Sequence, residues 1–328
     1  MTTTSEQLKA LIPEVVSEIA LSVVVEKTAL IQSGVAVPDY GRIDLTKGGD
    51  LIKIPFIPDF SGDAEVLDEN NPLTPGSFAA EEDVGVVCRR GRAWAYTTIA
   101  EVATGKDINQ IIGERLGRFW ARVYDKSLLS VLKGALPDTH KIDFSQKEFG
   151  QPDVTIDIPK IIDAMGLVGD NADNFEIIIM HSKVYTDLLK NQLIQFPNSA
   201  NTEQLVREGE FGRVLGRRII VSDSVTAETY TLDDNSGNTE TRYRYYTFIA
   251  QPGAMYFAFQ RELMTEEDKD ILAQKKYLVS TAHYVPHLKG VKWNSSILNP
   301  SDAELAYPGN WQKVWDDKAI RVVALITN

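Results

Sequence analysis

The chain has 328 residues, of which 43% are apolar and 24% charged, and its formal net charge is −12. This composition is typical of a globular protein with two modest domains or one elaborated domain. No stretch approaches the ~20 apolar residues that a membrane-spanning helix requires, and the polar first ten residues indicate no secretory signal. The acidic balance argues against strong binding to DNA phosphates, and the single cysteine excludes an intrachain disulfide.

Residues 1–40 are predicted to form an N-terminal arm built around one helix. Pro13 suits the first turn of a helix, and Gly34 and Pro38 are signals that end it. Because a single apolar stripe must be buried somewhere, we expect it to pack either in the core of its own subunit or against a neighbouring subunit. The apolar residues that recur at helical spacing are Val15, Val16, Ile19, Val23, Val24, Leu30 and Ile31.

Two strands follow, Leu51–Ile57 and Val84–Thr98, joined by a long connection rich in Pro, Gly and Asn. A connection of this length inside a compact domain is unusual and is generally functional or disordered. We call residues 57–88 the tongue. From Ile54 to Cys88 the chain has no Lys or Arg, so this segment is strongly acidic.

The longest helical pattern in the sequence ends before Pro137. Asp107 is a candidate N-cap, with Gln110 three residues further on, whereas Gly113 and Gly117 weaken the helix slightly. About 29 residues at ~1.5 Å each predict a rod of ~40 Å. The apolar residues of this pattern are Ile108, Ile112, Leu116, Phe119, Val123, Leu128, Val131, Leu132 and Leu136.

The rest of the chain alternates helices and strands, which predicts an α+β fold. Helices are expected over Ile158–Leu167 and from a Ser182 cap through Leu189. The expected strands are Phe175–Met180, Arg213–Val221, Thr226–Leu232, Thr241–Ala250, Tyr256–Phe259, Lys276–Tyr284 and Ile320–Thr327.

The histidines do not form a recognisable site. His283 and His287 have the i, i+4 spacing of a helical metal site, but their stretch is extended and contains Pro286. His181 lies between a strand and a helix with no Gly-rich phosphate loop, so we expect it to begin the helix.

The remaining candidate motifs also have simpler structural interpretations. Cys88 lies in an alternating strand and is expected to be a buried apolar residue rather than a nucleophile. Gly216 is expected in a turn or bulge, and Asp233–Asn238 in a hairpin turn rather than a calcium loop. We therefore expect no enzyme activity, no cofactor and no bound metal.

Three segments carry a family resemblance. Phe211–Ser224 has a Gly ahead of an apolar strand that ends in Ser-Asp, Ile178–Tyr185 is a strand leading into a helix, and Tyr284–Trp293 is a strand end with Gly, aliphatic and Trp residues. Together with the order of elements, these segments resemble the major capsid proteins of tailed phages, which share the Hong-Kong-97-type fold with encapsulin shells. The resemblance covers nearly the whole chain.

The resemblance implies a fold with an N-terminal arm, an E-loop tongue, a peripheral P-domain with a long spine helix, and an axial A-domain. The implied division is an arm over residues 1–40, P-domain strands with the tongue over 41–98, the spine helix over 99–136, the A-domain over 137–270, a long P-domain strand over 271–295, and a C-terminal segment returning to the A-domain over 296–328.

The function implied by the resemblance is structural. Many copies would form hexamers and pentamers that close into an icosahedral shell around the double-stranded DNA genome of a tailed phage or prophage. The shell would be assembled in the host cytoplasm and form the virion capsid, with a portal and a decoration protein as further partners, no sequence-specific DNA binding and no membrane. The alternatives are an encapsulin-like compartment that encloses a cargo enzyme and a cytoplasmic cysteine hydrolase that uses Cys88.

Two departures from the family pattern limit what carries over. Some forty residues precede the first strand, so we expect no fused scaffolding domain of the kind that some members carry, and we expect a separate scaffold protein. The tongue has no Lys, so the covalent cross-link that some members form does not carry over.

Charge suggests which surfaces of neighbouring subunits meet. Acidic residues of the tongue repel one another and need a basic surface elsewhere, whereas four basic residues of the spine helix are spaced three or four apart and so share one side. We hypothesise that the tongue of one subunit docks on this side of its neighbour's helix, against the simpler interpretation that both are solvated faces. The residues are Asp59, Asp63, Glu65, Asp68, Glu69, Glu81, Glu82 and Asp83 on the tongue, and Arg115, Arg118, Arg122 and Lys126 on the helix.

Overall fold

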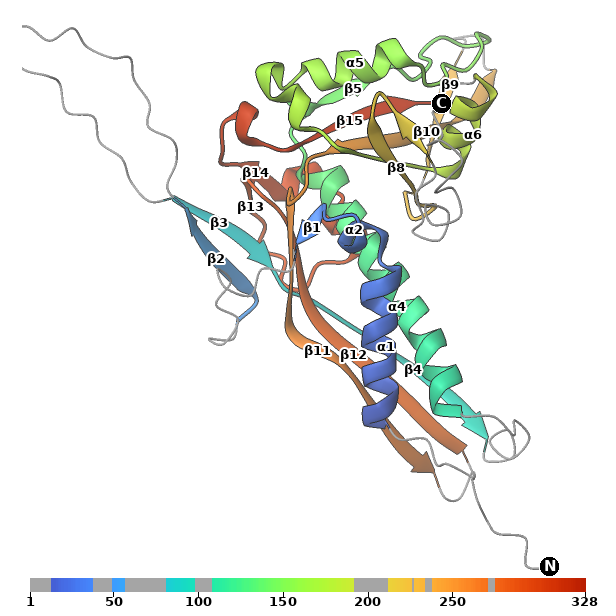
Figure 1. Ribbon diagram of the computed structural model, residues 1–328, viewed down its shortest axis with the longest axis vertical. Helices are drawn as coiled ribbons and strands as arrows, with labels where there is room; N and C mark the ends of the chain where they lie inside the picture. The colour runs from blue at the N-terminus through green and yellow to red at the C-terminus, as the bar shows by residue number, and fades with distance from the viewer. Residues whose placement is uncertain are drawn as a thin grey trace, which may run out of the picture.

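The computed structural model describes residues 13–37, 49–56, 81–97, 108–191, 212–225, 227–233, 238–270 and 275–328. These residues form an elongated body and a compact body stacked end to end (Figure 1). We use the name P-domain for the elongated body, which contains α1, α4, β4, β11 and β12, and the name A-domain for the compact body around β10 and β15.

The helices of the described part differ greatly in length, and α4 is the spine of the P-domain. Their bounds are α1 Pro13–Lys27, α2 Ala29–Gln32, α4 Ile108–Ala135, α5 Ile158–Gly166, α6 Ser182–Lys190 and α8 Asp302–Leu305.

The strands fall into a four-stranded sheet in the P-domain, a larger sheet in the A-domain and two separate hairpins. Their bounds are β1 Ala36–Val37, β2 Leu51–Phe56, β3 Glu81–Val86, β4 Cys88–Thr97, β5 Lys141–Asp143, β6 Ile177–Met180, β7 Arg213–Val214, β8 Arg217–Val221, β9 Glu228–Asp233, β10 Thr239–Ala250, β11 Met255–Asp270, β12 Lys275–Leu288, β13 Val291–Trp293, β14 Trp311–Lys313 and β15 Val322–Thr327.

The P-domain is two-layered, with α1 and α4 side by side along one face of the sheet β1-β11-β12-β4 (Figure 1). Its core is aromatic: the Tyr124 ring lies 4.7 Å from the Tyr284 ring, measured between centroids, and Trp120 donates a hydrogen bond from Nε1 to Ser280 Oγ at 2.8 Å. The 28 residues of α4 give a rod of about 42 Å. The predicted spine helix and the predicted long strand therefore form one rigid unit.

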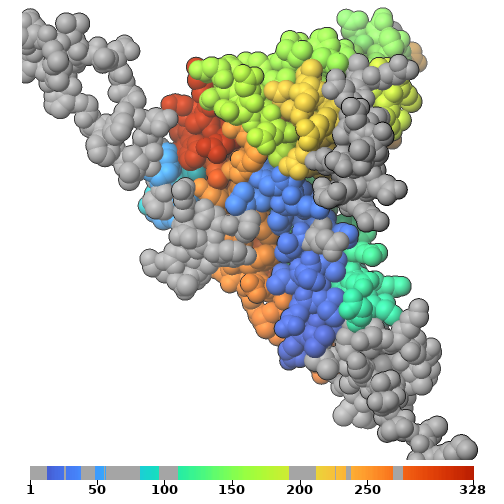
Figure 2. Space-filling view, in the orientation of Figure 1, coloured from blue at the N-terminus to red at the C-terminus, as the bar shows by residue number. Residues whose placement is uncertain are grey.

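The helix of the arm packs in the core of its own subunit, which is one of the two predicted outcomes. Val16, Ala20 and Val24 of α1 and Leu30 of α2 are fully buried, and α1 lies along the P-domain (Figure 2). The arm can approach α4 closely because the facing residues on α4 are glycines. A Cβ atom added at Gly117 would lie 2.6 Å from Val23 Cβ.

The A-domain is built around a sheet with the strand order β5-β15-β10-β6-β8-β7. β6 and β15 are buried along their whole lengths, which explains their continuous apolar sequences. The expected hairpin around Asp233–Asn238 is confirmed, since β9 and β10 pair antiparallel from Asp233 opposite Thr239.

Side-chain contacts connect the A-domain to the P-domain. Lys133 near the end of α4 pairs with Glu228 of β9, and Arg218 of β8 donates from Nη2 to the carbonyl oxygen of Ser33 at 3.1 Å. The arm is thus held by both bodies.

Several sequence expectations are corrected. His181 and not Ser182 is the N-cap of α6, because its Nδ1 accepts from Lys183 N at 3.0 Å. The strand expected over 213–221 is a hairpin, since Leu215 and Gly216 have φ of 52° and 77° and turn the chain between β7 and β8. The Gln110 side chain donates from Nε2 to Glu114 Oε1 at 2.6 Å, and the predicted N-cap Asp107 lies outside the described residues.

The division of the chain also changes at one point. The strand predicted over Tyr256–Phe259 extends to Asp270 as β11, and β11 pairs with β12 in the P-domain sheet. Residues 255–270 were expected in the A-domain, so we propose that the A-domain ends near residue 251.

Candidate assembly interface

The four basic residues of the spine helix lie on one side of α4, as predicted, and all four are exposed. We call Arg115, Arg118, Arg122 and Lys126 the spine stripe. At about 100° per residue, these residues fall within one narrow arc of the helix, opposite the glycines that contact α1. Phe119 is next to this arc, and its ring contacts Trp94 of β4 with 5.2 Å between centroids. The spine stripe is therefore on the β4 side of the helix.

One of the four residues of the spine stripe, Lys126, has an ion-pair partner within its own subunit. Lys126 Nζ lies 3.5 Å from Asp302 Oδ2, and Arg90 of β4 approaches the same carboxylate at 3.7 Å. Within the described ranges, Arg115, Arg118 and Arg122 have no ion-pair partner. Three exposed guanidinium groups thus remain available to an acidic segment of another molecule.

The tongue acids divide into three groups. Glu82 is half-exposed and pairs with Lys53 of β2 at 2.5 Å, and Glu81 belongs to β3. A second group lies outside the described residues and consists of Asp59, Asp63, Glu65, Asp68 and Glu69.

Asp83 is the third case, because it does not lie on the surface. It is buried, accepts from Gly290 N at 3.2 Å, and lies 4.0 Å from His287 Nε2. Side chains alternate along a strand, so Asp83 faces inward where Glu82 faces outward. The docking hypothesis placed all the acidic residues of the tongue on one exposed surface. For Asp83 this is wrong, because its side chain is buried.

Asp125 has a structural role that the sequence did not indicate. This buried residue of α4 accepts hydrogen bonds from the backbone N–H groups of Ala29 at 3.2 Å and Leu30 at 3.3 Å. It thereby supplies the cap at the start of α2, where Thr28 makes no side-chain cap bond. A contact between residues 96 positions apart leaves no local pattern in the sequence.

Burial raises the pKa of Asp125 to about 6, although the two backbone hydrogen bonds lower it. Because the folded-state pKa lies above the usual 3.8, the contribution of Asp125 to stability is greatest below about pH 4 and is lost as the pH rises through 6. The shift in pKa corresponds to roughly 3 kcal/mol of unfolding free energy.

We expect Asp125→Asn to remove this pH-dependent contribution to stability. The difference in unfolding free energy between wild type and variant should therefore change by roughly 3 kcal/mol between pH 4 and pH 7. Guanidinium titrations at several pH values measure this difference, and the same pH dependence of stability in wild type and variant would contradict the prediction.

The cysteine is unsuited to nucleophilic chemistry. Cys88 is fully buried, as expected, and burial raises the pKa of its thiol to about 12, so almost no thiolate forms near neutral pH.

His283 and His287 do not form a metal site together, because they lie on an extended strand, roughly 13 Å apart at the usual strand rise. The described ranges bring no three His, Cys, Asp or Glu side chains together as a metal site, and none of their helices is long and apolar enough to span a membrane.

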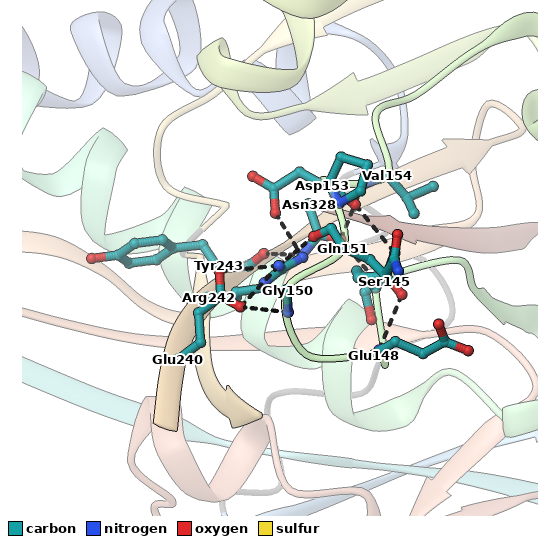
Figure 3. A network of polar contacts seen from close by, with 12 residues as sticks. Ser145, Glu148, Gly150, Gln151, Asp153, Val154, Glu240, Arg242, Tyr243 and Asn328 are labelled. Carbon is teal, nitrogen blue, oxygen red and sulfur yellow. Dashed lines mark hydrogen bonds and ion pairs between the residues drawn. The ribbon is translucent and has the colours of Figure 1, made fainter. Parts of the chain in front are cut away.

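A polar network fixes one loop of the A-domain (Figure 3). The buried side chain of Asn328 accepts from the N–H groups of Gln146 at 2.7 Å and Val154 at 3.3 Å, and donates to Tyr230 Oη and the Tyr243 carbonyl, both at 2.9 Å. Beside it, Arg242 contacts Asp153, Glu240 and the Gln151 carbonyl. This network holds residues 145–154 against the sheet.

Solved capsid structures of phages have the same architecture. The capsid of Ralstonia phage GP4 aligns with a TM-score of 0.63 and 11% identity, covering 92% of this chain and 90% of that one. The Cyanophage Pam1 capsid asymmetric unit aligns with a TM-score of 0.56 and 11% identity, covering 92% of each chain. The fold is therefore the Hong-Kong-97-type fold of shell-forming proteins.

Sequence comparison identifies the family within that class. The major capsid protein of Bacillus phage SPP1 is 31% identical over 320 residues, which are 95% of each chain. A family model described as "Major capsid protein 13-like" matches residues 48–320. The chain belongs to the Gp13-like major capsid protein family and is a structural protein of the virion shell.

Proposed function

We propose that the shell is built from hexameric and pentameric rings, encloses double-stranded DNA, and is held together in part by docking of the tongue of one subunit on the spine stripe of the next. The observation that carries the docking proposal is the exposure of Arg115, Arg118 and Arg122, without ion-pair partners in the described ranges, in a chain whose net charge is −12. Each exposed pair contributes only ~0–1 kcal/mol, but the contact repeats in every subunit.

A charge-reversal cycle tests the docking. Arg118→Glu with Arg122→Glu should impair assembly and make it more sensitive to salt, and Asp68→Lys with Glu69→Lys should impair it as well. If the two groups face each other, the combined variant recovers part of the loss. Light scattering and electron microscopy at low and high salt measure assembly.

The control variants reverse exposed charges away from the spine stripe and the tongue. Arg321→Glu and Glu148→Lys change charge on the exposed surface of the described part, and we expect both to assemble normally. Defects of the two test pairs that simply add in the combined variant would show that the tongue and the spine stripe are not partners.

We further propose that a separate scaffold protein sets the curvature of the shell. Expressed alone, the chain should give rings, tubes or irregular shells, and co-expression with the scaffold should give uniform shells. Electron microscopy distinguishes these outcomes, and uniform closed icosahedra from the chain alone would contradict the proposal. A portal and a decoration protein are the further partners proposed, and the DNA is contained without sequence-specific contacts.

We also propose that the chain has no catalytic role. Support comes from the high pKa and the burial of Cys88, which count against the cysteine hydrolase that would use this thiol as its nucleophile.

A further inference from the structure

Strand β4 is the last strand of the P-domain sheet, with β12 on one side. The other side is covered only near the start of the strand. There, Val87 N donates to the Asp50 carbonyl at 2.9 Å and Arg89 N donates to Asn299 Oδ1 at 2.7 Å. From Gly91 onward no described strand pairs with this edge.

The outward hydrogen bonds of Val87 and Arg89 show which backbone groups face the free edge. In an antiparallel strand, alternate residues direct both N–H and C=O to the same side. The backbone groups of Gly91, Ala93, Ala95 and Thr97 therefore face away from β12. Gly91, Ala93 and Ala95 are exposed and have small side chains or none, so they leave the edge accessible.

Proteins usually protect such an edge, because its unpaired N–H and C=O groups can form hydrogen bonds with a strand of another chain. The charges along β4 determine which chain can pair. Arg92 is exposed on the face of the strand that also carries Trp94, and Trp94 packs on the spine helix beside the spine stripe. An added strand would therefore lie next to Arg92 and the spine stripe, which favours an acidic segment.

We propose that residues 63–69 of a second copy of this chain add as an extended strand to the free edge of β4, from Gly91 to Thr97. This inference rests on the proposed docking of the tongue and specifies how it binds. The segment contains Asp63, Glu65, Asp68 and Glu69, has no basic residue and no proline, and equals the edge in length at seven residues. Main-chain hydrogen bonds would supply affinity and the charges would select the partner.

Pairing of two β4 edges with each other is the competing arrangement. It would bring together two strands that each carry Arg89, Arg90 and Arg92 and have no acidic residue from Cys88 to Thr97, so it would supply no opposite charge to these arginines. The acidic segment is therefore the better occupant of this edge.

Hydrogen exchange of the wild-type chain is the first test, because it needs no variant. In rings, the amides of Gly91, Ala93, Ala95 and Thr97 should exchange quickly, whereas the β4 amides that face β12 are already protected. In assembled shells, we expect the outward amides to slow by about tenfold or more. Equal exchange in rings and shells would overturn the proposal.

A proline substitution tests the same bonds through assembly. The N–H of Ala93 faces outward, so Ala93→Pro removes a donor that the isolated subunit does not use, and edge strands tolerate proline at such positions. Ala93→Ser keeps the N–H and is the matched control. We expect rings of both variants to unfold near the wild-type temperature, and only Ala93→Pro to lose shell formation.

The outcomes separate this inference from the broader proposal. Normal shells from Ala93→Pro, with rescue still seen in the charge-reversal cycle, would overturn strand addition while leaving tongue docking in place. Additive defects in that cycle, with protection of the outward amides in shells, would overturn the charged contact and leave an edge occupied by some other strand.

Discussion

Gly117→Ala is expected to release the N-terminal arm from the spine helix. The added Cβ would lie 2.6 Å from Val23 Cβ and 2.7 Å from the Ala20 carbonyl oxygen, and a backbone oxygen inside a helix cannot move aside cheaply. Overpacking of this kind costs roughly 3 kcal/mol. For a chain of this size, that loss lowers Tm by about 4 °C if the subunit unfolds cooperatively.

The matched control is Gly166→Ala in α5. That position has open space around it, with nothing within 4 Å of an added Cβ, and Ala favours a helix over Gly by up to about 1 kcal/mol. Calorimetry should therefore show a lower Tm for Gly117→Ala and an unchanged or higher Tm for the control. Proteolysis of the arm should accelerate only in the Gly117 variant. An unchanged arm there would mean that α1 does not depend on the close helix crossing.

Asn328→Ala is expected to lower the free energy of unfolding of the A-domain by roughly 3 kcal/mol. The substitution removes four side-chain hydrogen bonds and leaves the N–H groups of Gln146 and Val154 without their acceptor, and unsatisfied polar groups of this kind cost about 1–3 kcal/mol each when buried. The loop that the network holds should open first, so hydrogen exchange of residues 145–154 should rise before global unfolding.

Asn294→Ala is the corresponding control, because Asn294 is exposed and a surface substitution of this type usually changes stability by less than about 0.5 kcal/mol. Chemical unfolding monitored by circular dichroism compares the two variants. Equal stability of both would show that the Asn328 network is not required to hold the loop.

Elements with strong local periodicity were predictable from the sequence. The spine helix was placed correctly because its apolar residues recur over 28 residues and Pro137 follows. The long strand β12 and the β9–β10 hairpin were likewise indicated by apolar alternation and by the turn residues between strands. The far half of β11 and the end of β12 from Val285 to Leu288 were missed. In β11, the exposed charges of Arg261, Glu262 and Glu266 mask the buried Leu263 and Thr265.

The candidate site was only partly predictable. Helical spacing placed Arg115, Arg118 and Arg122 on one exposed side of α4 without any knowledge of the fold. The burial of Asp83 follows from strand alternation, which a run of adjacent acids conceals. The cap that Asp125 provides for α2, and the use of Gly117 as a crossing point, depend on contacts between distant parts of the chain.

The pairing of early strands with late strands has a consequence for synthesis on the ribosome. In the P-domain, β4 at residues 88–97 pairs with β12 at residues 275–288, and in the A-domain, β5 at residues 141–143 pairs with β15 at residues 322–327. Neither sheet can be completed until most of the polypeptide has emerged, and contacts so distant in sequence form slowly. A prematurely terminated chain therefore lacks both finished sheets. We expect such a fragment to be left out of the growing particle, because the sheets that fix the shape of the subunit are unfinished.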